Sequence, residues 1–172
     1  TGFEFPTMLK ACWNGSSEML SSVSASITGM LYNRQLITYA GEDGVAAYGT
    51  VMYAGFLFVS VYAGYSSGAS PIMGYHFGAG NRAEMDNVLN RSLRLLFVTS
   101  LLLTALAFGL ARQFSMLFVG YDAELLEMTT RAFRICAIPF LFMWVNIYAS
   151  SFFTALNDGT VSARISFLRS LV

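Results

Sequence analysis

The residue best suited to chemistry in this chain is Glu18, a single acid inside the long apolar stretch 10–39. Asn14 lies four residues before it, and Ser21 and Ser22 lie three and four residues after it. On a helix these four side chains share one side. A charge at membrane depth costs on the order of several kcal/mol even on lenient scales, so an acid there marks an ion pathway by default. The spacing predicts a short polar stripe that faces a bundle interior or a cavity.

Glu18 is also compatible with a purely structural role. Its carboxyl group could hydrogen-bond to Ser or Asn side chains on adjacent helices. Lys10 is only about two helical turns away, which is equally compatible with a position of Glu18 at the cytoplasmic interface. Both alternatives stay open from the residues alone.

A second polar candidate is Asn146, which lies near the middle of the uncharged run 135–157. A mid-helix amide either lines a cavity or joins neighbouring helices by a hydrogen bond. Tyr53 and Tyr148 are candidates for the lining of a substrate cavity, because each combines an aromatic ring with a hydroxyl group. Packing in the core or against lipid is the ordinary role of such residues.

Other motifs do not predict catalysis or a metal site. The run 78–83 matches the dinucleotide pattern G-x-G-x-x-[GA], but it follows an apolar helix and lacks a strand–helix–strand context. His76 is the only histidine and has no Cys or acid at ligand spacing. Cys12 and Cys136 sit in apolar segments and are interpreted as small hydrophobic residues, not as a disulfide. We expect no metal, no cofactor and no catalytic residues.

The composition indicates a membrane protein. Of 172 residues, 55% are hydrophobic and only 12% are charged, whereas a soluble domain carries roughly 25% charged residues. This is too little charge to cover a globule of that size. The formal net charge is zero, which argues against a nucleic-acid partner. The expected partner is the lipid bilayer.

The chain reads as an all-α bundle of about four spanning helices with the start of a fifth. The predicted spanning segments are about 9–39, 45–70, 95–111, 124–155 and 161–172. Glycines in the second helix supply positions for close helix packing; they are Gly49, Gly55, Gly64 and Gly68. Pro139 is expected to kink the fourth helix.

The segments between the spanning helices are more polar. A short turn is predicted at 41–44, and an irregular glycine-rich segment at 74–81. The following segment, 81–96, keeps helical spacing of apolar residues with charged residues between them, which predicts an amphipathic helix at the membrane surface. A polar crossing at 112–123 leads to the fourth helix, and Arg131 and Arg134 near its start are expected to anchor at the interface.

Basic residues weakly favour a cytoplasmic start of the chain. In that orientation the inner side holds Lys10, Arg82, Arg91, Arg94, Arg164 and Arg169. The outer side holds Arg34, Arg112, Arg131 and Arg134.

Four stretches of the sequence resemble the MATE (multidrug and toxic compound extrusion) family. They are GSSEM, YAGEDGVAAYG, SSGASPIMGYHFGAGN and SSFFTALNDGTVSARISFLR. The block P-I-x-G-Y-x-x-G-A-G-N is the most specific, because similar blocks follow the second helix of each half in this family. The resemblance covers essentially residues 1–172 and identifies them as a partial C-terminal lobe.

The resemblance implies a twelve-helix, two-lobe transporter that works by alternating access. Such members export cationic amphiphilic drugs in exchange for protons or sodium ions, and several use the acid at the position of Glu18 for coupling. Several relatives carry a second acid in the fourth helix of this lobe, where this chain has only Asn146. The resemblance thus implies ion coupling through Glu18, in a multi-pass protein of the bacterial inner membrane linked to antibiotic resistance. The helical spacing adds Asn14 and Ser22 as candidates on the same side of the helix, and Asn146 is the polar candidate in the fourth helix.

Two other functions stay open. A lipid-linked oligosaccharide flippase of the same superfamily needs a cationic cavity for a pyrophosphate lipid, and these helices offer few Lys or Arg residues that could be buried. A non-transporting membrane scaffold is the third. Since the chain begins without Met and stops at Val172 within a new apolar stretch, we expect a fragment that lacks an N-terminal lobe.

Overall fold

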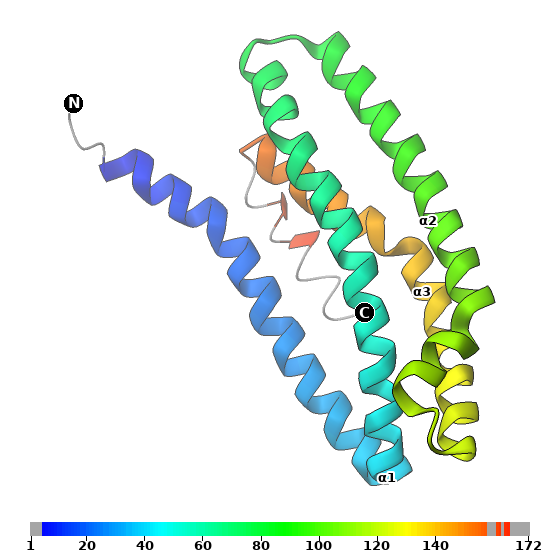
Figure 1. The fold of residues 1–172 in the computed structure, drawn as a ribbon. Helices are drawn as coiled ribbons and strands as arrows, with labels where there is room; N and C mark the ends of the chain where they lie inside the picture. The colour runs from blue at the N-terminus through cyan, green and yellow to red at the C-terminus, as the bar shows by residue number, and fades with distance from the viewer. Residues whose placement is uncertain (1–4, 158–160, 163, 166–172) are drawn as a thin grey trace.

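The computed structural model describes residues 5–157, 161–162 and 164–165. Within the first helix, the side chains of 6–7, 10–11, 13–18 and 20–21 lie outside this description. All regular structure in the described ranges is helical, in the order α1, α2, α3 (Figure 1). The predicted all-α fold class is therefore confirmed.

Helix α1 spans Phe5–Gly78 but breaks at Gly41, where φ is 63° and ψ is −155°. This combination is essentially restricted to glycine, because a Cβ would collide with the backbone. The break divides α1 into a first arm, 5–40, and a second arm, 42–78, which meet as a V at the lower end of Figure 1. The predicted turn at 41–44 is confirmed at Gly41.

The second arm is longer than predicted, since it passes through Pro71 and ends at Gly78. A proline removes only one backbone donor, and neighbouring groups in a helix bundle can compensate for that loss. The predicted irregular segment at 74–81 is thereby corrected to a short turn. Gly80 has a φ of 70°, and the backbone N–H of Asn81 donates to the carbonyl of His76 at 3.0 Å, which closes the helix end.

Helix α2 runs without interruption over Arg82–Val119. Asn81 caps it by accepting a hydrogen bond from the backbone N–H of Glu84 at 3.2 Å. The segment 81–96 is therefore the first part of one long helix and does not form a separate surface helix, which corrects the prediction. Its apolar residues pack against the hydrophobic core; they are Met85, Val88, Leu89 and the fully buried Leu96. An apolar stripe can be buried against protein as readily as against lipid, so amphipathic spacing alone does not distinguish the two.

Helix α3 spans Ala123–Ala155 and includes Pro139. Asp122 caps its start, because its carboxylate accepts from the backbone N–H groups of Glu124 and Leu125 at 2.8 and 3.2 Å. Beyond the end of α3, residues 161–162 are helical. Ser162 is fully buried, and its hydroxyl oxygen lies 2.9 Å from that of Ser150. Most of the predicted fifth helix lies outside the described residues.

The core lies between the second arm, α2 and α3, which contact one another in all three pairs. Large buried members are Phe58, Tyr62, Met73, Leu96, Phe133, Phe140, Trp144 and Tyr148. The rings of Phe58 and Phe140 pack in a tilted arrangement with their centroids 4.9 Å apart. Gly55 lies beside the Phe140 ring, which would be in ordinary van der Waals contact, at 3.4 Å, with a Cβ at this position.

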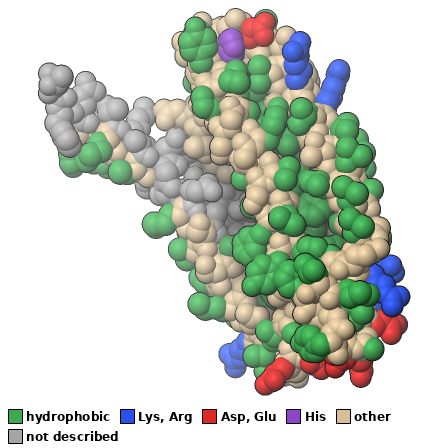
Figure 2. All heavy atoms as spheres, in the orientation of Figure 1, with side chains coloured by type: hydrophobic (Ala, Val, Ile, Leu, Met, Phe, Trp, Pro, Cys, Tyr) green, Lys and Arg blue, Asp and Glu red, His purple; other side chains and the backbone are tan. Residues whose placement is uncertain are grey.

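The helices have the length and apolar character of membrane spans. Three candidate spans occur in the described residues, at Ser22–Gly78, Arg82–Val119 and Ala123–Ala155, and the first of them contains the Gly41 break. Charged side chains gather at the two ends of the molecule, with hydrophobic and uncharged side chains between them (Figure 2). The chain is therefore a segment of a multi-pass membrane protein.

Candidate functional site

The predicted polar stripe lies on the first arm of α1. The backbone is helical at Asn14, Glu18 and Ser22, so the four-residue spacing places them on one side of the arm. The side chains of Asn14 and Glu18 lie outside the described ones, and the ion-coupling role of Glu18 stays a prediction. Ser22 is exposed, and its carbonyl accepts a hydrogen bond from the hydroxyl of Ser26 at 2.9 Å.

Asn146 lies on α3 and is half-buried, between two buried aromatic residues, Trp144 and Tyr148. Tyr148 belongs to the core and is only 4% exposed. Its ring lies 6.3 Å from that of Tyr65 on the second arm. Asn146 therefore sits on the helix that joins the core, while Glu18 sits on the first arm.

Tyr53 does not share a site with Tyr148. It lies on the second arm, is 58% exposed and stacks on Phe118 of α2 with ring centroids 5.5 Å apart. Phe118 lies one residue before the end of α2, next to the turn that leads into α3. Tyr148 lies in the last third of α3, seven residues before that helix ends, and so is far along α3 from this turn. The structure places both tyrosines in aromatic packing, and a substrate role for either stays a prediction.

In the bundle interior, hydroxyl groups join neighbouring helices. The hydroxyl of Tyr65 donates to the fully buried Ser92 at 2.9 Å, which joins the second arm to α2. The hydroxyl of Ser100 donates to the carbonyl of Leu141 at 2.6 Å, which joins α2 to α3. Such bonds between spanning helices fix the helices against one another. Only the tertiary structure shows which of the many serines face a neighbour.

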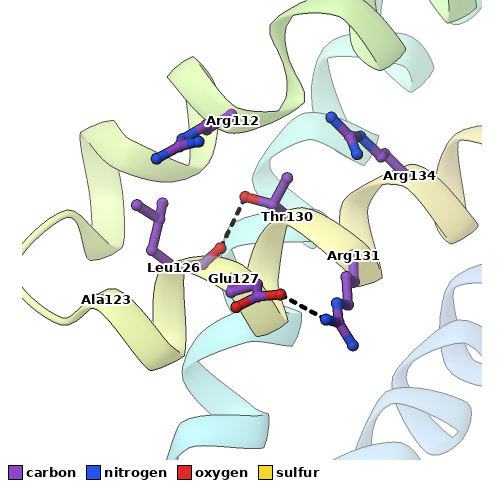
Figure 3. Close-up of a pocket in the computed structure, with 7 residues that line it drawn as sticks. All are labelled: Arg112, Ala123, Leu126, Glu127, Thr130, Arg131 and Arg134. Carbon is purple, nitrogen blue, oxygen red and sulfur yellow. Dashed lines mark hydrogen bonds and ion pairs between the residues drawn. The ribbon is translucent and has the colours of Figure 1, made fainter.

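A basic pocket of about 450 Å³ lies between the end of α2 and the start of α3. Its lining residues are Arg112, Ala123, Leu126, Glu127, Thr130, Arg131 and Arg134 (Figure 3). Glu127 forms an ion pair with Arg131 one helical turn away. The hydroxyl of Thr130 donates to the carbonyl of Leu126 at 2.7 Å, so it is already engaged. The sequence treated two of these arginines as separate anchors and did not predict that Arg112 joins them.

A second, smaller cleft of about 160 Å³ is lined only by apolar residues of the second arm, α2 and Phe133. Asn146, Tyr53 and Tyr148 line neither this cleft nor the basic pocket. Among the described residues, no group of three or more His, Cys, Asp and Glu side chains could hold a metal ion.

Comparison with known proteins decides the family. The model of the MatE family matches residues 18–172, which is most of the chain. The chain belongs to the MatE family. The matched range begins at Glu18 and includes the second arm, α2 and α3.

The MatE fold is also found by comparison with solved structures. The chain is similar to the crystal structure of MATE in complex with MaL6, with a TM-score of 0.88 and 21% sequence identity. The similarity covers 98% of this chain and 38% of that chain. No curated protein matches the chain. The described helices thus have the arrangement of part of a MATE protein, and the chain spans well under half the length of the solved one.

Proposed function

We propose that this chain is part of the C-terminal lobe of a secondary active multidrug antiporter in the bacterial inner membrane. It exports cationic amphiphilic compounds in exchange for protons or sodium ions, and Glu18 is the coupling carboxylate. The observation that carries this proposal is the MatE match over residues 18–172 together with the position of Glu18 in an otherwise uncharged span. Drug resistance follows from export if the compounds are antibiotics.

The position of Glu18 along the first arm supports a coupling role. Lys10 and Arg34 flank a run, 11–33, in which Glu18 is the only charged residue. At about 1.5 Å per residue, Glu18 lies roughly 12 Å along the helix from Lys10 and roughly 24 Å from Arg34. A carboxylate at that depth is stable only if a proton, a cation or a polar partner neutralises it.

Competition at one carboxylate gives a simple exchange mechanism. An ionised Glu18 attracts either a coupling cation or a cationic drug, and the charge of one excludes the other. Asn14 and Ser22, one turn to either side, would supply neutral oxygen atoms for the same cation. Asn146 on α3 would supply a further amide oxygen. The exposed ring of Tyr53 would offer an aromatic surface to a cationic drug at a separate position on the second arm.

The test is efflux of an ethidium-like dye by the full-length protein carrying Glu18→Gln. We expect loss of dye efflux and of its dependence on the ion gradient, because glutamine keeps the shape but cannot ionise. Glu84→Gln, on the exposed first turn of α2, is the matched control and is expected to transport normally. Wild-type efflux with unchanged pH dependence in Glu18→Gln would rule out the coupling role.

The same protein in liposomes distinguishes the ions. An imposed proton gradient and an imposed sodium gradient are applied separately at equal size, and dye movement is followed. Proton coupling predicts transport with the first and none with the second. Because this chain lacks a second membrane acid at 135–157, proton exchange is the expected result.

A further inference from the structure

The basic pocket gathers positive charge from two helices. Arg112 comes from α2, while Arg131 and Arg134 come from α3, and all three are exposed (Figure 3). Glu127 neutralises Arg131 through their ion pair. Within the part of the chain that the structure describes, Arg112 and Arg134 have no carboxylate partner within ion-pair distance. The pocket therefore carries a net positive charge that protein groups in the described ranges leave unneutralised.

The sequence places this pocket at one boundary of the bilayer. On α2 the uncharged run 95–111 separates Arg94 from Arg112. This run is roughly 25 Å long at about 1.5 Å per residue, close to the roughly 30 Å of the hydrocarbon core. On α3 the uncharged run 135–157 begins directly after Arg134. Both arginines thus stand at the edge of an uncharged span, on the same side of the membrane.

Exposed apolar side chains neighbour Arg112 and Arg134 along their helices. Leu110 and Met116 flank Arg112 along α2, and Ile135 and Ile138 follow Arg134 along α3; all four are exposed. An exposed guanidinium beside such residues meets the headgroup layer, where the available counter-ion is phosphate. Guanidinium groups bind phosphate with two parallel hydrogen bonds, and they do so more strongly when partly removed from water.

We propose that this pocket binds the phosphate of a membrane phospholipid, with Arg112 and Arg134 as its two ligands. A volume of about 450 Å³ holds a phosphate together with its glycerol and headgroup. Arg131 stays paired with Glu127 and closes one side. The helix start contributes no free donors at Glu124 and Leu125, because the carboxylate of Asp122 already accepts from their N–H groups. The site lies at the opposite end of α2 from the turn at 79–81. The proposal of a lipid site does not depend on the proposed transport function.

The experiment measures thermal unfolding of the full-length protein in a neutral detergent as phosphatidylglycerol is added. The variant is Arg112→Gln/Arg134→Gln. The matched control is Arg94→Gln, because Arg94 is also exposed on α2 and borders the same uncharged run at its other end. We expect the lipid to raise the melting temperature of the wild type and of the control. We expect apparent lipid affinity at least about tenfold weaker in the double variant, since bonds to two charged groups are lost.

Two further arms identify the bound group. Soluble glycerol phosphate at equal concentration is expected to give no shift, and a shift as large as that with lipid would instead make the pocket a soluble-anion site. An equal lipid response in the double variant and the wild type would overturn the proposal. This is also the result expected if a carboxylate from elsewhere in the full-length protein occupies the pocket in place of the lipid.

A measurement on the unmodified protein covers the case in which the double variant does not fold. A phospholipid with a photoreactive headgroup is cross-linked to the wild type, and the labelled peptides are identified by mass spectrometry. Labelling within 110–138 supports the site. Labelling elsewhere with none in this range contradicts it.

Discussion

The two arms of α1 have similar composition but different surroundings. In the second arm, every third or fourth residue is buried against α2 or α3, and Tyr62 is completely enclosed. In the first arm, the described large residues other than the half-buried Leu36 are exposed, with Met30 at 72% and Tyr39 at 85%. The first arm carries Glu18, whereas the second arm belongs to an uncharged stretch from 44 to 81. The tightly packed side chains and the acid Glu18 thus lie in different arms of α1.

This difference divides the described part of the chain into a tightly packed region and a more exposed arm. The second arm, α2 and α3 form a core held by aromatic contacts and by hydrogen bonds such as that from Ser100 to Leu141. None of the described side chains of the first arm belongs to that core, and most of them are exposed. In a MatE protein of the length of the solved one, more than half of the chain lies outside the region matched here. The following changes test how sharply the two regions differ.

The largest expected loss of stability comes from truncating a large side chain in the core. Phe140→Ala should destabilise the full-length protein by about 3 kcal/mol or more, because it removes the ring that packs on Phe58 and Gly55 and leaves a cavity. Phe142→Ala is the matched control on the same helix, since Phe142 is 62% exposed, and it should cost less than about 0.5 kcal/mol. Thermal unfolding in detergent measures both. Equal losses would show that the exposed face of α3 is packed as tightly as the core.

The joint between the arms should respond less strongly. Gly41→Ala should cost about 1–3 kcal/mol, because alanine is strained at a φ of 63° and a ψ of −155°. Gly49→Ala should be neutral or slightly stabilising, since no atom of the described residues lies within 4 Å of the position of its added Cβ and alanine favours helix. Unfolding of the two variants side by side gives the comparison. A neutral Gly41→Ala would mean that the arms can meet through another backbone conformation.

The smallest expected effect concerns one hydrogen bond inside the bundle. Ser100→Ala removes the donor to the Leu141 carbonyl and should cost about 0.6 kcal/mol, the average for such bonds between membrane helices. Ser60→Ala is the control, because the Ser60 hydroxyl is exposed and donates only within its own helix, to Phe56. A loss of stability above about 2 kcal/mol for Ser100→Ala would indicate that this hydrogen bond also stabilises the conformation of α3 near Pro139.

Much of the fold could be predicted from the sequence, but some boundaries could not. Long uncharged runs predicted the spanning helices, and the glycine-rich turn at 41–44 predicted the break. The sequence predicted that the second arm ends near residue 70, whereas it ends at Gly78. The reason is that Pro71 is a helix breaker in water but is tolerated within a bundle. The segment 81–96 was placed at the membrane surface, because an amphipathic pattern does not say whether its apolar face meets lipid or protein.

The glycines illustrate the same limit. The sequence marked Gly49, Gly55, Gly64 and Gly68 as positions of close packing. Among the described residues, only Gly55 of these four has a neighbour, Phe140, within 4 Å of where a Cβ would lie. Spacing puts small residues on a helix but does not determine which of them faces another helix.

The sequence by itself determined that this chain spans a membrane several times, that its helices are interrupted near Gly41 and Asn81, and that one acid, Glu18, lies in an uncharged span. These properties follow from hydropathy, chain length and backbone sterics, which are local. The tertiary structure alone decided that Arg112 and Arg134 line one pocket, that Tyr65 donates to Ser92, and that Tyr53 and Tyr148 lie in separate contacts. Such pairs join residues of different helices, and their meeting depends on how each helix is rotated and tilted against its neighbours.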